Sequence, residues 1–144
     1  MMMKNLMIYS FVLVMLLVGC SEDESAIVME ETADCGETHE LVGQSMDLSS
    51  STANGISGTV TIVSDCEIQI SNFVYNGAGP NVSIYGGTNG DFESGISLSN
   101  PINGTVFQGE TLTVFLPDGT SLDEINSFSV WCFEFNIDFG SVQF

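Results

Sequence analysis

From Leu41 to the C-terminus, short runs in which apolar and polar residues alternate are separated by Gly, Asn, Asp and Pro. Alternation with a period of two is typical of strands with one buried face, and the turn-forming residues between the runs keep those strands short. No stretch sustains the apolar period of about 3.6 residues that an amphipathic helix requires. The pattern therefore predicts an all-β domain over residues 41–144, a single antiparallel β-sandwich or barrel-like fold of about seven to nine short strands.

Two of these runs predict a hairpin. Gly58 to Ser64 and Glu67 to Val74 are separated only by a short polar break, and each has β-branched residues on one face. Three further strands are predicted, and they are Asn81 to Tyr85, Gly95 to Leu98 and Gly109 to Leu116.

Two connecting segments have recognisable features of their own. Thr88 to Ser94 is polar and predicts a loop, whose two carboxylates are too few and too irregularly spaced for a calcium site. Ser121 to Ile125 predicts a single helical turn, with Ser121 as N-cap and Glu124 as its capping-box partner.

In the C-terminal run from Phe128 to Gly140, the odd-numbered and even-numbered positions differ in character. Its odd positions from Trp131 onward form a bulky apolar ladder, and its even positions include Cys132 and Glu134. If the strand continues to Phe135, Cys132 points away from the heavier core face and lies on the same face as Glu134. The expected result is a semi-buried thiol near a carboxylate.

The N-terminus predicts a secretory leader over residues 1–19. Lys4 gives a positive start, and the 13 residues from Leu6 to Val18 are almost entirely apolar, which is the length of a signal-peptide core and short for a membrane span. The run ends in Leu-Val-Gly-Cys, which resembles a bacterial lipobox. Cys20 is therefore the predicted lipidation site, and its acyl chains would attach the protein to the membrane.

Residues 20–40 predict an extended acidic tether. Eight of the 19 carboxylates fall between Glu22 and Glu40, and like charges at this density repel. Ser21 to Glu24 also resembles the acidic export signal that sends some lipoproteins to the surface of the outer membrane, although a plain solvated spacer fits equally well. The expected location is the cell envelope, at the outer membrane. His39, the only histidine, is predicted to be solvated in this tether.

Charge and composition exclude several classes of function. The formal net charge is −18, and the single basic side chain, Lys4, lies in the leader. Nucleic acids are therefore excluded as partners, since phosphate binding depends on Lys and Arg. A nucleophilic thiolate needs a cationic neighbour or a helix N-terminus to lower its pKa, which makes a cysteine hydrolase improbable for Cys132. The cysteines form no Cys-x-x-Cys pair, so no metal site is predicted, and no hydrolase triad or phosphate loop is present.

Four motifs in order resemble the DM13 domain, a small extracellular module found beside DOMON domains and alone in bacterial lipoproteins. They are GISGTVTIV at residues 55–63, ISNFVYNGAGPNV at 70–82, TLTVFLPDGTSLDEINSFSVWCFEF at 111–135 and the Phe-Gly pair at 139–140. The resemblance implies an all-β fold and a role in electron transfer, with the cysteine of Trp131-Cys132 as a redox thiol or as a ligand to a prosthetic group such as haem. The family often has His where this chain has Asn54, which puts in doubt any scheme that uses that His as a second ligand.

The resemblance also favours a Cys35–Cys66 disulfide, because Cys66 occurs in some members and would pair with a cysteine about 30 residues upstream. Cys132 would then be free, although the sequence leaves the other two pairings open. The functional alternative to electron transfer is a non-catalytic surface module that binds a protein partner or a glycan, in which Cys132 is a packed, small hydrophobe. Neither hypothesis assigns the chain a catalytic activity of its own.

Overall fold

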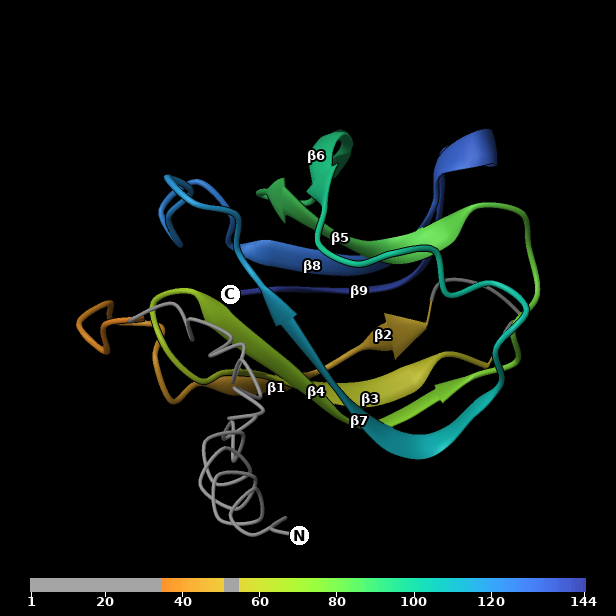
Figure 1. The fold of residues 1–144 in the computed structure, drawn as a ribbon, viewed down its shortest axis with the longest axis horizontal. Coiled ribbons are helices and arrows are strands. Elements are labelled where there is room, and N and C mark those ends of the chain that lie inside the picture. The colour runs from red at the N-terminus through yellow and green to blue at the C-terminus, as the bar shows by residue number, and fades with distance from the viewer. Residues whose placement is uncertain (1–34, 51–54) are drawn as a thin grey trace, which may run out of the picture. The chain divides into compact units, whose positions relative to one another are not determined.

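The computed structural model describes residues 35–50 and 55–144, which all belong to one compact unit. Its nine strands form two antiparallel sheets that lie face to face as the layers of a sandwich (Figure 1). One sheet has the order β1 (Ser45–Asp47), β3 (Ser57–Ile62), β4 (Glu67–Tyr75) and β7 (Phe107–Phe115). The other has the order β2 (Ser49–Ser50), β9 (Ile137–Gln143), β8 (Ser127–Cys132), β5 (Val82–Thr88) and β6 (Asp91–Ser97). The sheets do not close into a barrel, so the predicted all-β fold is confirmed as a β-sandwich.

The predicted hairpin is also confirmed, because β3 pairs with β4 in antiparallel register. Its inward residues are those that the alternation predicted: Val60, Ile62 and Ile68 are all 0% exposed. On β7, Val114 is buried in the same core. Apolar alternation therefore defined the buried face of the four-stranded sheet.

A bulge in β4 changes which residues of that strand face the core. The register with β7 shifts between Ile70 and Phe73, and Asn72 adopts a left-handed φ of 51°. The extra residue reverses the parity, so Phe73 and Tyr75 turn inward and are both 0% exposed. Uninterrupted alternation from Ile70 would have placed Tyr75 on the outer face instead.

The prediction of a loop from Thr88 to Ser94 is wrong. β5 and β6 are joined by a two-residue turn at Asn89 and Gly90, whose φ angles are 51° and 81°. Asn-Gly with two positive φ angles is the preferred tight hairpin turn, and it lets Asp91 pair with Thr88. β1 and β2 were not predicted because both are short and exposed, with only Leu48 buried between them.

The predicted helical turn at Ser121 is present. The Ile125 N–H donates to the Ser121 carbonyl at 3.0 Å, and the Ser121 N–H donates to the Glu124 carboxylate at 3.2 Å. The second contact is the backward half of a capping box.

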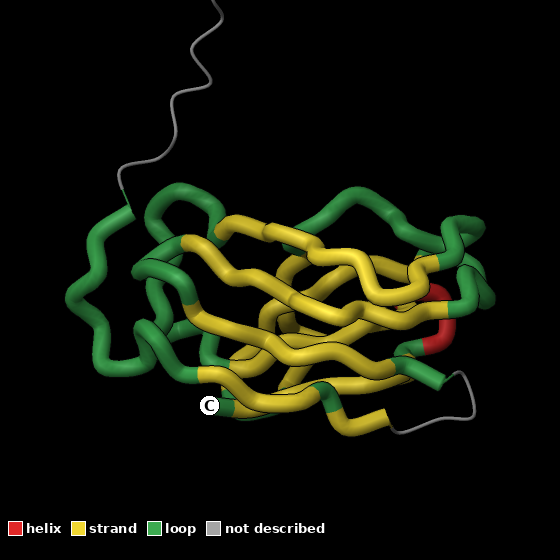
Figure 2. The backbone as a smooth tube through the Cα atoms, turned by 90° about the horizontal axis from the view of Figure 1, so that it is seen from below, coloured by secondary structure: helices red, strands yellow, loops and turns green. Residues whose placement is uncertain are grey.

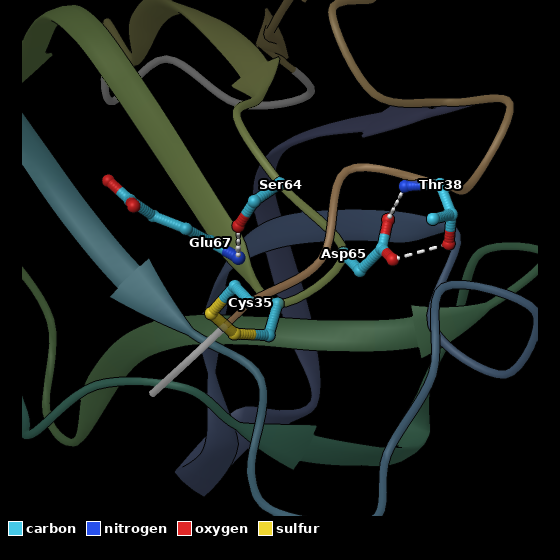
Figure 3. Close-up of a disulfide and its surroundings, with 6 residues drawn as sticks. Cys35, Thr38, Ser64, Asp65 and Glu67 are labelled. Carbon is cyan, nitrogen blue, oxygen red and sulfur yellow. Dashed lines mark hydrogen bonds between the residues drawn. A yellow bond between two sulfur atoms is a disulfide. The ribbon is translucent and has the colours of Figure 1, made fainter. Parts of the chain in front are cut away.

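Residues 35–40 belong to the folded domain, which corrects the prediction that they form part of an extended tether. Cys35 and Cys66 form a disulfide with Cα atoms 5.3 Å apart, and the Asp65 carboxylate accepts hydrogen bonds from Thr38 beside it (Figure 3). The His39 N–H donates to the same carboxylate at 2.9 Å, and its Nε2 lies 3.3 Å from Asp123. His39 is therefore half-buried against the turn between β3 and β4 and is not simply solvated.

The leader, the lipidation site Cys20, the tether up to residue 34 and Asn54 lie outside the described residues. Within the described part of the chain, no helix has the length and apolar character needed to cross a membrane. One short 3-10 helix, η1 (Phe133–Phe135), lies at one end of the sandwich (Figure 2).

Candidate functional site

Cys132 lies at the end of β8, the strand between β5 and β9 in the five-stranded sheet. All six residues of β8 are buried, and Phe128, Val130 and Cys132 belong to the core between the sheets. The even positions of this strand therefore face the core, and Trp131 faces the opposite side. The prediction that Cys132 points away from the core is wrong.

The strand also ends earlier than predicted. The chain enters η1 directly after Cys132, and Asn136 takes a left-handed φ of 50° that turns it into β9. Phe133 and Phe135 are consequently 52% and 63% exposed instead of extending a core ladder. Glu134 is exposed on the same turn and does not share a strand face with the thiol.

Cys132 is 0% exposed, and its thiol is hydrogen-bonded to the backbone. Its Sγ donates to the Pro80 carbonyl at 3.1 Å. Pro80 belongs to the loop that joins β4 to β5, so a contact across 52 residues of sequence fixes the thiol. Cys132 is the one free cysteine among the described residues.

Tyr75 is a second buried polar group held by the same loop. Its hydroxyl donates to the Ala78 carbonyl at 2.6 Å, and the residue is 0% exposed. Burial, first, and the charge that Cys132 carries when ionised together raise the pKa of Tyr75 to about 12. The thiol and the phenol are therefore both held by backbone carbonyls of the same loop.

The loop from Asn76 to Asn81 packs tightly over these groups. Gly79 has a φ of 106°, and a Cβ added there would lie 3.1 Å from the side chains of both Phe139 and Val82. Only glycine fits this combination of backbone angle and close contact. The outer side of the loop is exposed, so it separates the Cys132 thiol from solvent.

Aromatic rings lead from this region towards the surface. Tyr75 stacks on Phe107 with ring centroids 6.5 Å apart, and Phe73 lies 5.1 Å from Phe107. Phe107 is half-buried, whereas Phe73 and Tyr75 are fully buried. Sequence reasoning missed Tyr75, because its inward orientation depends on the bulge at Asn72.

The surroundings of Cys132 do not fit a haem group. A haem ligand needs an open position beside its sulfur, but this Sγ is fully buried in a packed core and is directed at a backbone carbonyl. Residues 35–50 and 55–144 also contain no cluster of three or more His, Cys, Asp or Glu side chains that could hold a metal ion. The site therefore consists of a thiol, a phenol and the loop that holds both.

Comparison with known proteins identifies the family of the chain. The family model described as "Electron transfer DM13" matches residues 47–144. Protein Skeletor from Drosophila melanogaster is similar in its isoforms B/C and D/E, each 34% identical over 97 residues, or 62% of this chain. The chain spans only 12% and 6% of the length of these relatives. No solved structure matches. Because the family model covers more than half of the sequence, including both sheets and Cys132, the chain belongs to the DM13 electron-transfer family.

Proposed function

We propose that this protein is an electron-transfer module of the cell envelope in which Cys132 is the redox residue. The observation that carries the proposal is the position of Cys132: a free thiol, buried in the core of an electron-transfer domain and directed at the carbonyl of Pro80, in the same loop that accepts the Tyr75 hydroxyl. The packing of Cys132 keeps it from reacting with bulky reagents, but it does not prevent electron transfer through the protein.

The proposed step is a one-electron oxidation of the thiol. The S–H bond of Cys132 breaks, one electron passes to a one-electron oxidant on a partner protein, and the proton leaves to water. A backbone carbonyl such as that of Pro80 accepts a hydrogen bond but does not take up the proton. Proton release therefore requires the loop at Asn76 to Asn81 to open briefly, which makes the reaction slow and controlled by the loop. The reverse step returns one electron and one proton to the sulfur.

An exposed apolar patch lies next to Cys132 and would serve as the docking site for that partner. Phe133, Phe135 and Ile137 are 52%, 63% and 41% exposed, and Tyr85 stacks on Phe133 with centroids 6.4 Å apart. Exposed aromatic patches of this kind mark protein interfaces. Glu134 lies within the patch and the mature chain has no Lys or Arg, so the fitting partner is a redox protein with an apolar centre and a basic rim.

A spectroscopic experiment tests the redox assignment. The full-length protein, purified from its native host, is treated with a small one-electron oxidant and compared with Cys132→Ser and with Val130→Ala. The second variant removes buried volume on the same strand face but keeps the thiol. If the wild type and Val130→Ala reduce the oxidant and Cys132→Ser reduces little of it, the proposal is supported. Equal reduction of the oxidant by all three proteins would refute it. A visible chromophore lost only in Cys132→Ser would instead restore the prosthetic-group hypothesis.

The lipoprotein assignment is a separate part of the proposal and rests on the sequence alone. Cys20 would carry the lipid, and residues 21–34 would hold the domain away from the membrane. Labelling cells with radioactive palmitate tests it, since Cys20→Ser should lose the label and accumulate uncleaved precursor. Protease treatment of intact cells then distinguishes surface export from a plain spacer, because only a surface-exposed domain is digested.

A further inference from the structure

A cavity of about 410 Å³ lies on the opposite side of β8 from Cys132. It is formed where β2, β9 and the turn between β5 and β6 meet, and Trp131 and Phe92 contribute its aromatic part. Their ring centroids lie 5.8 Å apart. The volume is within the range of pockets that hold small ligands.

Trp131 has a polar atom that the fold leaves without a partner. The side chain is only 8% exposed, and its Nε1 is the one buried side-chain nitrogen or oxygen in the described residues that makes no hydrogen bond. Buried Trp N–H groups usually find an acceptor, because an unpaired buried donor loses its interaction with water. A ligand that brings an acceptor to this position would restore the missing bond.

The remaining lining offers fixed polar groups. Asp138 is held in place by Ser129 at 2.7 Å, by the Gly140 N–H at 2.9 Å and by Ser141 at 2.6 Å. Its carboxylate is therefore already oriented before any ligand arrives. The other polar residues that line the cavity, besides Ser141, are Asp47, Ser49 and Gln143.

These groups select among ligand chemistries. An anion is disfavoured, because the cavity contains the carboxylates of Asp47 and Asp138 and the domain has no Lys or Arg. An ammonium ion would suit the carboxylates, but it has no acceptor for the Trp131 N–H. A hydroxyl group both donates and accepts, so a ligand rich in hydroxyls can satisfy the carboxylates and the indole together.

We infer that this cavity binds a short neutral saccharide. Ligand hydroxyls donate to Asp47 and Gln143, and one accepts from Trp131 Nε1. Because Nε1 is covered in this structure, binding must also uncover it. This binding function goes beyond electron transfer and does not depend on it, since Cys132 and Trp131 lie on opposite faces of β8.

Trp131 itself is the probe for the test, because it is the only tryptophan of the chain. The full-length protein is titrated with glucose, galactose, mannose, N-acetylglucosamine and their common disaccharides, with lysine as a cationic control and sulfate as an anionic control. We expect at least one saccharide to give a saturable change in Trp131 emission and to shift its indole N–H resonance. The inference is overturned if no saccharide does so at tens of millimolar, or if lysine or sulfate produces the same response.

Two variants locate the site. Gln143→Met removes the amide at nearly constant size and should weaken saccharide binding roughly three- to tenfold, which corresponds to the loss of one hydrogen bond. Gln108→Met, at an exposed position on β7 in the other sheet, is the matched control and should bind as the wild type does. Equal affinity of both variants and the wild type would place the binding elsewhere. Cys132→Ser should bind normally, which separates this inference from the redox proposal.

Discussion

The Cys132 thiol and the Tyr75 hydroxyl donate to carbonyl oxygens two residues apart in one loop, to Pro80 at 3.1 Å and to Ala78 at 2.6 Å. The two residues come from different sheets, so the loop from Asn76 to Asn81 ties the layers together where the redox residue lies. Both side chains are 0% exposed. Disturbing the loop or either donor should therefore change stability and access to the thiol together.

Tyr75 should make the protein sensitive to alkaline pH. Its pKa is about 12 in the folded state and about 10 in an unfolded chain, so the unfolded state loses its proton first as the pH rises. The contribution is fully present below pH 10, and the free energy of unfolding should fall by on the order of 2–3 kcal/mol between pH 10 and 12. Denaturant melts across that range measure it.

Tyr75→Phe should flatten this alkaline fall, at a cost of about 1 kcal/mol at neutral pH for the lost hydrogen bond to Ala78. Tyr85→Phe is the control, because Tyr85 is half-exposed and stacks on Phe133 outside the core. A fall between pH 10 and 12 that is equally steep in Tyr75→Phe and in the wild type would exclude Tyr75 as its source.

Gly79→Ala should destabilise the protein and speed up labelling of Cys132. The new Cβ meets Phe139 and Val82 at 3.1 Å, and the φ of 106° strains any other residue. We expect about 1–2 kcal/mol from backbone strain and a further ~1–3 kcal/mol from crowding. Labelling of the thiol by a maleimide should accelerate about tenfold for each 1.4 kcal/mol by which opening of the loop becomes easier.

Gly119→Ala is the matched control for backbone strain alone. Gly119 has a φ of 79°, but a Cβ there would meet nothing within 4 Å. It should be destabilised less than Gly79→Ala and should leave the labelling rate of Cys132 unchanged. If both variants label equally fast, the loop does not control access to the thiol.

The Cys35–Cys66 disulfide should stabilise the domain by about 3–4 kcal/mol, since it closes a loop of 31 residues in the unfolded chain. Alkylation without reduction, followed by mass spectrometry, should modify Cys132 only after unfolding and should leave Cys35 and Cys66 unmodified. In denaturant melts, the double variant with Cys35→Ala and Cys66→Ala should be less stable than the wild type by this amount. Alkylated Cys35 together with protected Cys132 would show that the pairing is different.

Asp65 should make the free energy of unfolding depend on pH in the acid range. The pKa of Asp65 is held below its usual value by hydrogen bonds. The one from the His39 backbone has the largest effect, and the one from the Thr38 side chain comes next. A depressed pKa gives stability that is present above the unfolded pKa and is lost as the pH falls through the folded one. Asp65→Asn should therefore lower stability at neutral pH and reduce its fall below pH 4, as followed by melts from pH 7 to 2. Asp118→Asn, at an exposed position, should behave as the wild type, and an identical acid profile for Asp65→Asn would contradict the role of this carboxylate.

The sequence predicted the fold well wherever burial follows simple alternation. Val60, Ile62 and Ile68 lie in regular strands, so their parity alone defined the core face. Simple alternation does not give the inward position of Tyr75, because a bulge at Asn72 reverses the parity and no residue before it requires one.

Cys132 was placed on the wrong face for a different reason. β8 is buried on both sides, so the greater bulk of Trp131, Phe133 and Phe135 could not indicate which face meets the other sheet. The turn at Asn136 that ends the ladder depends on a left-handed residue, which asparagine permits but does not require. The docking of Thr38 and His39 on Asp65 was missed because it depends on contacts 26 and 27 residues apart in sequence.

Voltammetry of the full-length protein adsorbed on an electrode tests the central claim most directly. The account predicts a one-electron, one-proton wave whose potential falls by about 59 mV per pH unit, which is present in Val130→Ala and absent in Cys132→Ser. A wave of the same size and potential in Cys132→Ser, or no wave in the wild type, would contradict the assignment of Cys132 as the redox residue.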